Sequence, residues 1–473
     1  MQKTMANGRK RGVCGVGRWM IDFCFLGTTS LFLGLGTTQV SAAEITITNA
    51  NNTAITGANN TNAWSTTNGP NNTMIWTNST TGWTNFFATS AGNPPYLNGL
   101  RWDSSSAAGL AIGGSAANAG TLVGTNPFVD VTSATGLVKL GTGTFAGTNG
   151  LIKKGAGTLD LQGATSTFTG GLTIEAGRVN MKLTNNVPIS NNLNLQGGEL
   201  FFNVASPLNL TFAHVTWGNG KILGGPGSIT ASSYTITNNV AITNNYTLAG
   251  NGGLLKTGEG TFTLSSASTY TGTTIVNAGT LLVNGTSQSS SVVVNTGATV
   301  GGSGTLLNVV MQGGTLAPGN SPGLLSMMSL NADHGIFAFE LGAPTTRGIT
   351  YDAINVQGLL TLGENTEWMF TIHNNYTFQL NDTYDLFNWD SLDAASFDVS
   401  VLQAALPDLN TASTALTWDV SEFTTSGIVS VIPEPSTLQL ICLPLKIVKF
   451  MAVILHENHK GNYMYAIPHA NVL

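Results

Sequence analysis

The chain has 473 residues, of which only 8% are charged, and it contains 58 glycines. Disordered chains combine low hydropathy with high net charge, so this composition indicates a folded, β-rich body with many tight turns. Between Glu44 and Ile432, nine basic and 20 acidic residues give a net charge of −11 without a basic stripe. Such a surface would repel a phosphate backbone, which excludes nucleic acid as a partner. The three cysteines lie outside this body, so no disulfide framework is expected: Cys14, Cys24 and Cys442.

The first 43 residues have the pattern of a secretory signal peptide. A basic segment around residues 9–11 precedes the apolar stretch WMIDFCFLGTTSLFLGLGTT, and the small residues of QVSAAE follow. This pattern predicts export, with cleavage after Ala42 or Ala43. A transmembrane anchor is the alternative. It is disfavoured because the uninterrupted apolar run from Phe23 is short and rich in threonine.

Residues 44–135 combine segments rich in Asn, Thr and Ser with four tryptophans, Trp64, Trp76, Trp83 and Trp102. We interpret this region as an N-terminal cap together with the first coils of the repetitive structure that follows. In this interpretation the tryptophans cover the open end of an apolar core. The alternative is that they form aromatic platforms for sugar binding.

Two long internal repeats occupy the centre of the chain. The first begins at Asn149 and reads NGLIKKGAGTLDLQGATSTFTGGLTIEAGRVNM, and the second begins at Asn251 and reads NGGLLKTGEGTFTLSSASTYTGTTIVNAGTLLV. Short segments within them alternate apolar and polar residues, which predicts half-buried strands separated by tight Gly or Asn corners. A strand of this kind cannot bury its apolar face alone, so the repeats predict stacked coils with a continuous core.

These stretches resemble autotransporter-associated β-strand repeats, which occur in passenger domains of secreted bacterial proteins. GGTLAPGNSPGLL, from Gly313, is typical of the end of such regions. The resemblance implies an all-β chain with a right-handed parallel β-solenoid, or β-helix, over residues 136–330. Ten apolar residues at equivalent positions of the two repeats are expected to face its core: Leu151, Leu159, Leu161, Ile174 and Val179, and Leu254, Phe262, Leu264, Val276 and Leu281.

Residues 331–430 form an acidic region. From Asp333 to Glu422 there are 13 acidic residues, with Arg347 as the single basic residue. Strand-like runs such as GIFAFELG and EWMFTIHNN predict terminal coils and a C-terminal β-cap. A solvated acidic surface is the preferred interpretation of two acidic pairs that are alternatively a Ca²⁺ site, Asp382/Asp385 and Asp390/Asp393.

Residues 431–473 begin with VIPEPSTLQLICLPL, which resembles the PEP-CTERM sorting signal of Gram-negative bacteria. The matching residues are Pro433, Glu434, Pro435 and Ser436. The resemblance implies the export machinery and an exosortase-type sorting enzyme as partners. After about residue 440 the tail departs from this pattern, so we expect it not to anchor the chain. Its apolar run is interrupted by Pro444, Lys446 and Lys449.

GNSPG, at residues 319–323, matches the G-x-S-x-G motif of hydrolases literally. In a nucleophile elbow the residue after the serine donates its N–H group to the oxyanion hole, but Pro322 has no N–H group. No helix pattern follows, so we interpret the motif as a turn. The glycine-rich elements of the repeats precede strands rather than helices, which argues against phosphate loops. Three isolated histidines are interpreted as surface or packed residues: His214, His334 and His373.

Polysaccharide-degrading β-helices need clustered carboxylates on one face. Between residues 136 and 325 the acids are interpreted as single surface charges: Asp160, Glu175, Glu199 and Glu259. The sequence therefore predicts a protein without catalytic residues, cofactor or metal. We expect it to be a structural or adhesive protein at the cell surface, outer envelope or outside the cell. An extracellular polysaccharide or another surface is its expected partner. The alternative is a carbohydrate-binding or carbohydrate-active β-helix protein.

Overall fold

A computed structural model of the chain describes its central and C-terminal parts most fully. The described residues are 23–24, 44–48, 55–56, 69–77, 83–87, 96–103, 109–112, 120–122, 127–140, 145–147, 150–161, 167–168, 170–181, 192–202, 207–224, 227–409 and 415–434. The predicted cleavage residues Ala42 and Ala43 lie outside them. So do Trp64, Pro435 and Ser436, as well as the side chains of Trp76 and Trp83.

The described chain is built almost entirely from short β-strands. The strands that precede the first repeat are β1 (Phe23–Cys24), β2 (Glu44–Thr48), β3 (Ile55–Thr56), β4 (Gly69–Thr77), β5 (Trp83–Phe87), β6 (Tyr96–Asp103), β7 (Gly109–Ile112), β8 (Gly120–Leu122), β9 (Phe128–Val131), β10 (Leu137–Leu140) and β11 (Phe145–Gly147). The first repeat forms β12 (Leu151–Lys154), β13 (Thr158–Leu161), β14 (Thr167–Phe168), β15 (Leu172–Ile174) and β16 (Arg178–Met181). The second repeat forms β24 (Gly253–Lys256), β25 (Thr261–Leu264), β26 (Thr274–Val276) and β27 (Gly279–Val283).

Further strands connect the two repeats and extend the stack beyond them. Those between the repeats are β17 (Asn192–Leu195), β18 (Glu199–Phe202), β19 (Leu208–Trp217), β20 (Lys221–Gly224), β21 (Gly227–Ile236), β22 (Ile242–Asn244) and β23 (Thr247–Ala249). Those that follow the second repeat are β28 (Val292–Asn295), β29 (Ala298–Gly302), β30 (Thr305–Pro318), β31 (Leu324–Leu341), β32 (Ala353–Ile372), β33 (Thr383–Asp385), β34 (Phe387–Asp393), β35 (Leu416–Asp419) and β36 (Ile428–Pro433).

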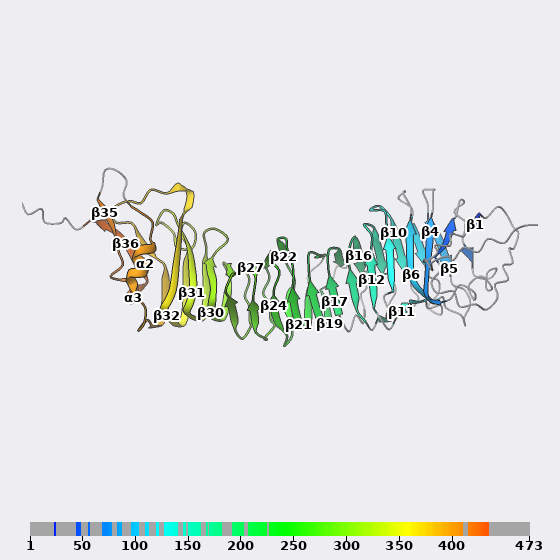
Figure 1. Cartoon of the computed structure of the whole chain (residues 1–473), viewed down its shortest axis with the longest axis horizontal. Helices are drawn as coiled ribbons and strands as arrows, with labels where there is room; N and C mark the ends of the chain where they lie inside the picture. The colour runs from blue at the N-terminus through cyan, green and yellow to red at the C-terminus, as the bar shows by residue number, and fades with distance from the viewer. Residues whose placement is uncertain are drawn as a thin grey trace, which may run out of the picture.

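The strands stack as parallel coils, which confirms the predicted β-solenoid. β12 pairs in parallel with β15, and β15 with β17, so that the Cα atoms of Leu151, Leu172 and Leu193 are successive partners 21 residues apart. A second parallel sheet forms in the same way from eight strands, in the order β20-β18-β16-β13-β10-β7-β5-β3. Figure 1 shows the result as a long stack of strands, with the N-terminal coils at one end and β35 and β36 at the other.

All ten predicted core side chains are buried, none with more than 3% of its surface exposed. Equivalent positions therefore face inward in both repeats, as stacking requires. The sequence repeat is nevertheless longer than one coil. Leu159 and Val179 belong to the same repeat, but their Cα atoms are partners on the neighbouring strands β13 and β16. One repeat therefore supplies strands to two successive coils.

Trp102 is fully buried, with Val131 as its Cα partner in the next coil. A buried indole cannot serve as a platform for sugar, so this alternative is wrong for Trp102. Helix is confined in the described residues to three short elements, α2 (Val399–Ala405), α3 (Phe423–Ser426) and the 3₁₀ turn η2 (His373–Asn375). None of the helices in this part of the chain has the length and apolar character needed to span a bilayer.

The acidic region continues the stack and then closes it. β31 crosses residue 330, and β32 and β34 follow it in the same parallel sheet. β33, β36 and β35 then form a small antiparallel sheet. The last coil presents Trp368, whose ring lies 5.5 Å from that of Phe423 in α3 and 6.0 Å from that of Phe397 just before α2. These aromatic contacts cover the open end of the core, as a terminal cap must.

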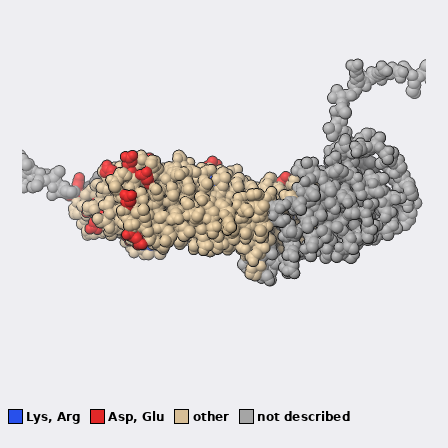
Figure 2. All heavy atoms as spheres, turned by 90° about the horizontal axis from the view of Figure 1, so that it is seen from below, with Lys and Arg blue, Asp and Glu red and all other residues tan. Residues whose placement is uncertain are grey.

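The described charges are unevenly distributed along the molecule. In Figure 2 the acidic side chains gather over the C-terminal end, whereas the part of the shaft beside them is nearly free of charge. On this face the described surface therefore consists of a shaft with few charges and an acidic end.

Replacing Leu264 by alanine should lower the free energy of unfolding by about 2–5 kcal/mol, because the buried side chain loses its contacts and leaves a cavity. Chemical denaturation followed by circular dichroism measures this loss. Glu259→Ala is the matched control. Glu259 is exposed, and the other repeat already carries Ala156 at that position, so a change of less than about 0.5 kcal/mol is expected. Equal losses in both variants would contradict the stacked core.

Replacing Gly279 by alanine should destabilise the protein more than replacing Gly297. Both glycines have positive φ, +64° and +81°, so both variants incur backbone strain of roughly 1–2 kcal/mol. A Cβ atom at residue 279 would also lie 2.4 Å from the carbonyl oxygen of Gly258, whereas one at residue 297 would meet no atom within 4 Å. Thermal and chemical unfolding of the two variants should therefore differ. Equal stability would show that the corner at residue 279 can open without cost.

Candidate functional site

The corner that opens each repeat contains a buried lysine. Lys153 is the last inward-facing residue of β12, and Lys256 is the last of β24. Both side chains have 0% exposure. Lys153 donates hydrogen bonds to the carbonyls of Lys154 and Gly155 at 2.5 and 2.8 Å, and to that of Ala176 at 3.2 Å. Sequence reasoning recognised this lysine only as part of the repeat pattern. Its shared position in both repeats was the signal that could have identified it as a buried group.

Burial acts on both ammonium groups in the same direction. It lowers the pKa of Lys153 to about 8, while the carboxylate of Asp130 opposes the shift. Burial also lowers the pKa of Lys256, with Glu259 opposing. The cause is the loss of water around the charged form. The corner carbonyls replace that water as hydrogen-bond acceptors.

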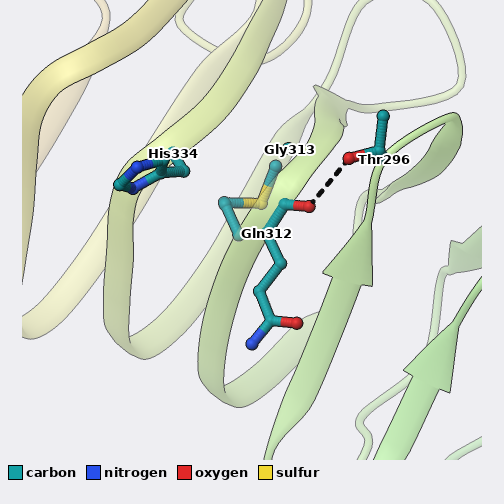
Figure 3. Close-up of a pocket in the computed structure, with 5 residues that line it drawn as sticks. Thr296, Gln312, Gly313 and His334 are labelled. Carbon is teal, nitrogen blue, oxygen red and sulfur yellow. Dashed lines mark hydrogen bonds between the residues drawn. The ribbon is translucent and has the colours of Figure 1, made fainter.

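A shallow hollow of about 400 Å³ lies where β30 and β31 turn a corner of the stack, lined by Thr296, Met311, Gln312, Gly313 and His334. It lies beside a bulge, at which Asn295 pairs with both Gln312 and Gly313. Figure 3 shows the Thr296 hydroxyl donating to the carbonyl of Gln312, at 3.2 Å, with His334 on the adjacent strand. The His334 ring is 60% exposed, and its Nδ1 lies 3.0 Å from Oδ2 of Asp333. The hollow can therefore offer the Gln312 amide to a small polar ligand, and an exposed imidazole whose two nitrogens lie beside Asp333 and Asn365.

The G-x-S-x-G motif forms a turn, as predicted, and its serine contacts a carboxylate. The hydroxyl of Ser321 donates to Oε2 of Glu340 at 2.6 Å. His373 also approaches this oxygen, with its Nδ1 at 3.7 Å. In a catalytic triad the histidine stands between the serine and the acid, so that it can take the hydroxyl proton. Here the acid stands between them, and the arrangement lacks that relay.

Asp352 lies directly behind this turn. It is buried, and its carboxylate accepts hydrogen bonds from the N–H groups of Gly323 and Glu340, both at 2.7 Å. Burial raises the pKa of Asp352 to about 7, and the nearby charge of Glu340 acts in the same direction. Asp352 therefore ties the turn to β31 while titrating near neutral pH.

The acids of the shaft were expected to be single surface charges, and this prediction is wrong for Asp160, which is only 2% exposed. Its Cα partners are Lys139 in the preceding coil and Asn180 in the following one, so the flanking side chains cover it. Glu199 forms an ion pair with Arg178 at 2.7 Å. Glu175 lies 4.0 Å from Lys154. These acids lie beside neighbours in adjacent coils and do not converge on one point.

The interpretation of the acidic pairs as a solvated surface holds for Asp390 and Asp393, which are exposed, and is wrong for Asp382 and Asp385. Asp382 is buried and accepts a hydrogen bond from the N–H group of Gln379 at 2.7 Å, which fixes the loop before β33. Asp385 is partly buried by its ion pair with Arg347, at 3.1 Å. Within the described residues no group of three or more His, Cys, Asp or Glu side chains could hold a metal ion.

The remaining predicted residues have ordinary surroundings. His214 contacts Ser233 at 2.7 Å, and His373 contacts Glu340. His334 contacts Asn365 at 3.1 Å in addition to Asp333. Pro433 is the last residue of β36, and the N–H group of Glu434 donates to the carbonyl of Ala415 at 2.9 Å. The described half of the predicted sorting motif is therefore attached to the cap.

Comparison with known proteins identifies the repeats. The family described as the passenger-associated-transport-repeat matches residues 151–181 and 254–283, the two segments that hold the buried lysines. An extracellular serine protease from Serratia marcescens is 39% identical over 82 residues, which are 17% of this chain and 8% of the protease. The chain thus spans a small part of that relative. Neither similarity tests the resemblance to PEP-CTERM signals, which stays a prediction.

Asp352 should make the protein more stable as the pH falls from about 7 towards 4. In this range the folded state holds a proton that the unfolded state, with a pKa near 3.8, has released. The contribution is on the order of a few kcal/mol, since each pKa unit corresponds to about 1.4 kcal/mol. Urea denaturation at pH 5 and pH 8 measures it. The Asp352→Asn variant should lose this part of the pH dependence, and an unchanged dependence would contradict the assignment.

Proposed function

We propose that this chain is an exported, non-catalytic passenger-type protein that serves as a structural or adhesive element at the bacterial surface. The observation that carries the proposal is the pair of passenger-associated-transport-repeats, each of which forms strands of two stacked coils. The long stack supports the proposal, because it presents a large lateral surface with few charges. Such a surface suits broad contact with an uncharged partner better than recognition of one small molecule.

A non-catalytic role is supported by the surroundings of the chemistry-bearing residues. The hydroxyl of Ser321 is held by Glu340, and the residue after it is a proline without an N–H group. The acids of the shaft lie singly along the coils. We therefore propose that the protease activity named for the Serratia protein resides outside the stretch that this chain resembles.

The second candidate is a carbohydrate-binding role, and the hollow beside His334 favours it. Hydroxyl and amide groups also form contacts along the outer face of neighbouring coils. Asn277 and Asn295 are joined at 2.6 Å, and Ser329 donates to Asn308 at 2.8 Å. Groups of this kind hydrogen-bond to sugar hydroxyls. An extracellular polysaccharide is accordingly the surface partner that we propose.

Cell fractionation combined with mass spectrometry of the mature termini tests the exported role. The protein is expected in the envelope or extracellular fraction, beginning at Ala43 or Glu44. An intact Met1 on extracytoplasmic protein would contradict the predicted signal cleavage. Accumulation of the folded chain in the cytoplasm would overturn the proposal itself.

Activity and adhesion are separated by a second measurement on the purified protein. Hydrolysis of casein and of neutral polysaccharides should be at background level, and Ser321→Ala should not change it. Hydrolysis that this variant abolishes would establish an enzyme instead. Retention of the protein by immobilised neutral polysaccharides, lost on His334→Ala but not on His214→Ala, would favour the carbohydrate-binding candidate.

A further inference from the structure

The two buried lysines interrupt a column of apolar side chains. Successive Cα partners in this column are Val129, Lys153, Ile174, Leu195, Trp217, Ile236, Lys256, Val276 and Val294. Apart from the indole N–H of Trp217, the members other than the lysines are hydrocarbon side chains. An ammonium group in such a column loses its water, which is costly unless the protein supplies full hydrogen bonding. Each lysine therefore needs a specific compensation at its corner.

That compensation comes from two coils at once. Lys153 donates to the carbonyl of Gly155 in its own corner and to that of Ala176 in the next coil. Lys256 repeats the arrangement. It donates to the carbonyl of Gly258 in its own corner and, at 3.2 Å, to that of Ala278 in the next coil. The same two-coil arrangement of hydrogen bonds therefore occurs at both corners.

The glycine that follows the second carbonyl leaves room for the ammonium group. Gly177 has φ +66°, and a Cβ atom there would lie 2.8 Å from Nζ of Lys153 and 2.2 Å from the carbonyl oxygen of Gly157. Gly279 occupies the same place in the second repeat, with φ +64°. A side chain at either position would displace the carbonyls that surround the lysine. The corner is therefore shaped around the ammonium group.

Trp217 shows how the same column treats a neutral donor. Its indole N–H donates to the carbonyl of Gly220, at 2.9 Å, within its own coil. An indole has one N–H group, whereas an ammonium group has three. The single donor of the indole can satisfy one carbonyl in its own coil, whereas the three donors of an ammonium group can reach carbonyls in two coils. The lysines therefore differ from Trp217 in joining successive coils.

We infer that the corner of each repeat is a cage specific for a primary ammonium group, which the chain fills with its own lysine, and that this group locks the two coils of the repeat together. The lock explains the extent of the repeats. The matched segments, 151–181 and 254–283, are longer than the coil spacing, which is 21 residues between Leu151 and Leu172 and 20 between Leu254 and Thr274. Each begins just before a lysine and extends beyond the second carbonyl that the lysine holds. The lock depends on coil geometry and is independent of the exported role proposed above.

Hydrogen exchange of the full-length protein tests the lock in the second repeat. Lys256→Met keeps an unbranched chain of similar volume but removes the donors, leaving the carbonyls of Gly258 and Ala278 without them. Amides of β26 and β27 should then exchange about tenfold faster or more. Lys154→Thr is the matched control, because the second repeat carries Thr257 at the equivalent position. Hydrogen exchange of the Lys154→Thr variant should be unchanged. Unaltered or slower exchange in Lys256→Met would overturn the inference, since an apolar side chain would then serve equally well.

Guest ions test the specificity of the cage. Lys256→Ala removes the atoms that n-propylammonium can replace. Adding n-propylammonium chloride should restore slow exchange in β26 and β27, whereas tetramethylammonium chloride at equal concentration should not, because it has no N–H donor. Equal effects of the two salts would show a general salt response and refute a specific cage. Lys153→Ala repeats the measurement on β15 and β16 and must give the same ranking.

Discussion

The described coils pair their backbones with the coils before and after them, and at the corners part of that pairing is replaced by side-chain donors. Some corner carbonyls still accept a backbone N–H group of the next coil, as Gly157 does from Arg178 at 3.1 Å, whereas others lie beside buried side chains. A buried carbonyl without a donor is costly. The protein supplies the missing donors from side chains: Lys153, Lys256, the indole of Trp217, and the amide of Asn238, which reaches the carbonyls of Val240 and Thr261 at 2.7 and 2.8 Å.

The same constraint separates the interior from the surface. Because each inward column repeats from coil to coil, one polar residue in it affects both neighbours, so a buried polar residue needs a hydrogen-bond partner, as Thr274 has in Ser289. The outer face is free of that restriction along the shaft and carries hydroxyl and amide groups. At the last coil the stack has no further neighbour, and Trp368 must be covered instead by Phe397 and Phe423. The cap thus covers the last coil in the way that the next coil covers each coil elsewhere in the stack.

The sequence predicted the features that depend on periodicity. Leu264 and Phe262 face the core because alternation within a strand and recurrence between repeats both indicate it. Asp160 was misjudged because its burial depends on which residues of other coils lie beside it, and register between coils is not visible in one strand. Asp382 was misjudged for a related reason, since its partner is the backbone of its own loop. The buried lysines recur at the same position of both repeats, which the sequence shows. Their acceptor carbonyls come from two coils, and that arrangement cannot be read from the sequence.

Two locked segments in one shaft have a mechanical consequence. Between Met181 and Gly253 the described members of the column contain no lysine. The described coils there are joined by ladder hydrogen bonds, apolar contacts and exposed side-chain hydrogen bonds such as that of His214 with Ser233. The energy that holds neighbouring coils together therefore differs along the stack. Stability in a solenoid is close to a sum of coil energies and nearest-neighbour terms. Local opening should accordingly favour the segment between the repeats, while each repeat opens as a pair of coils.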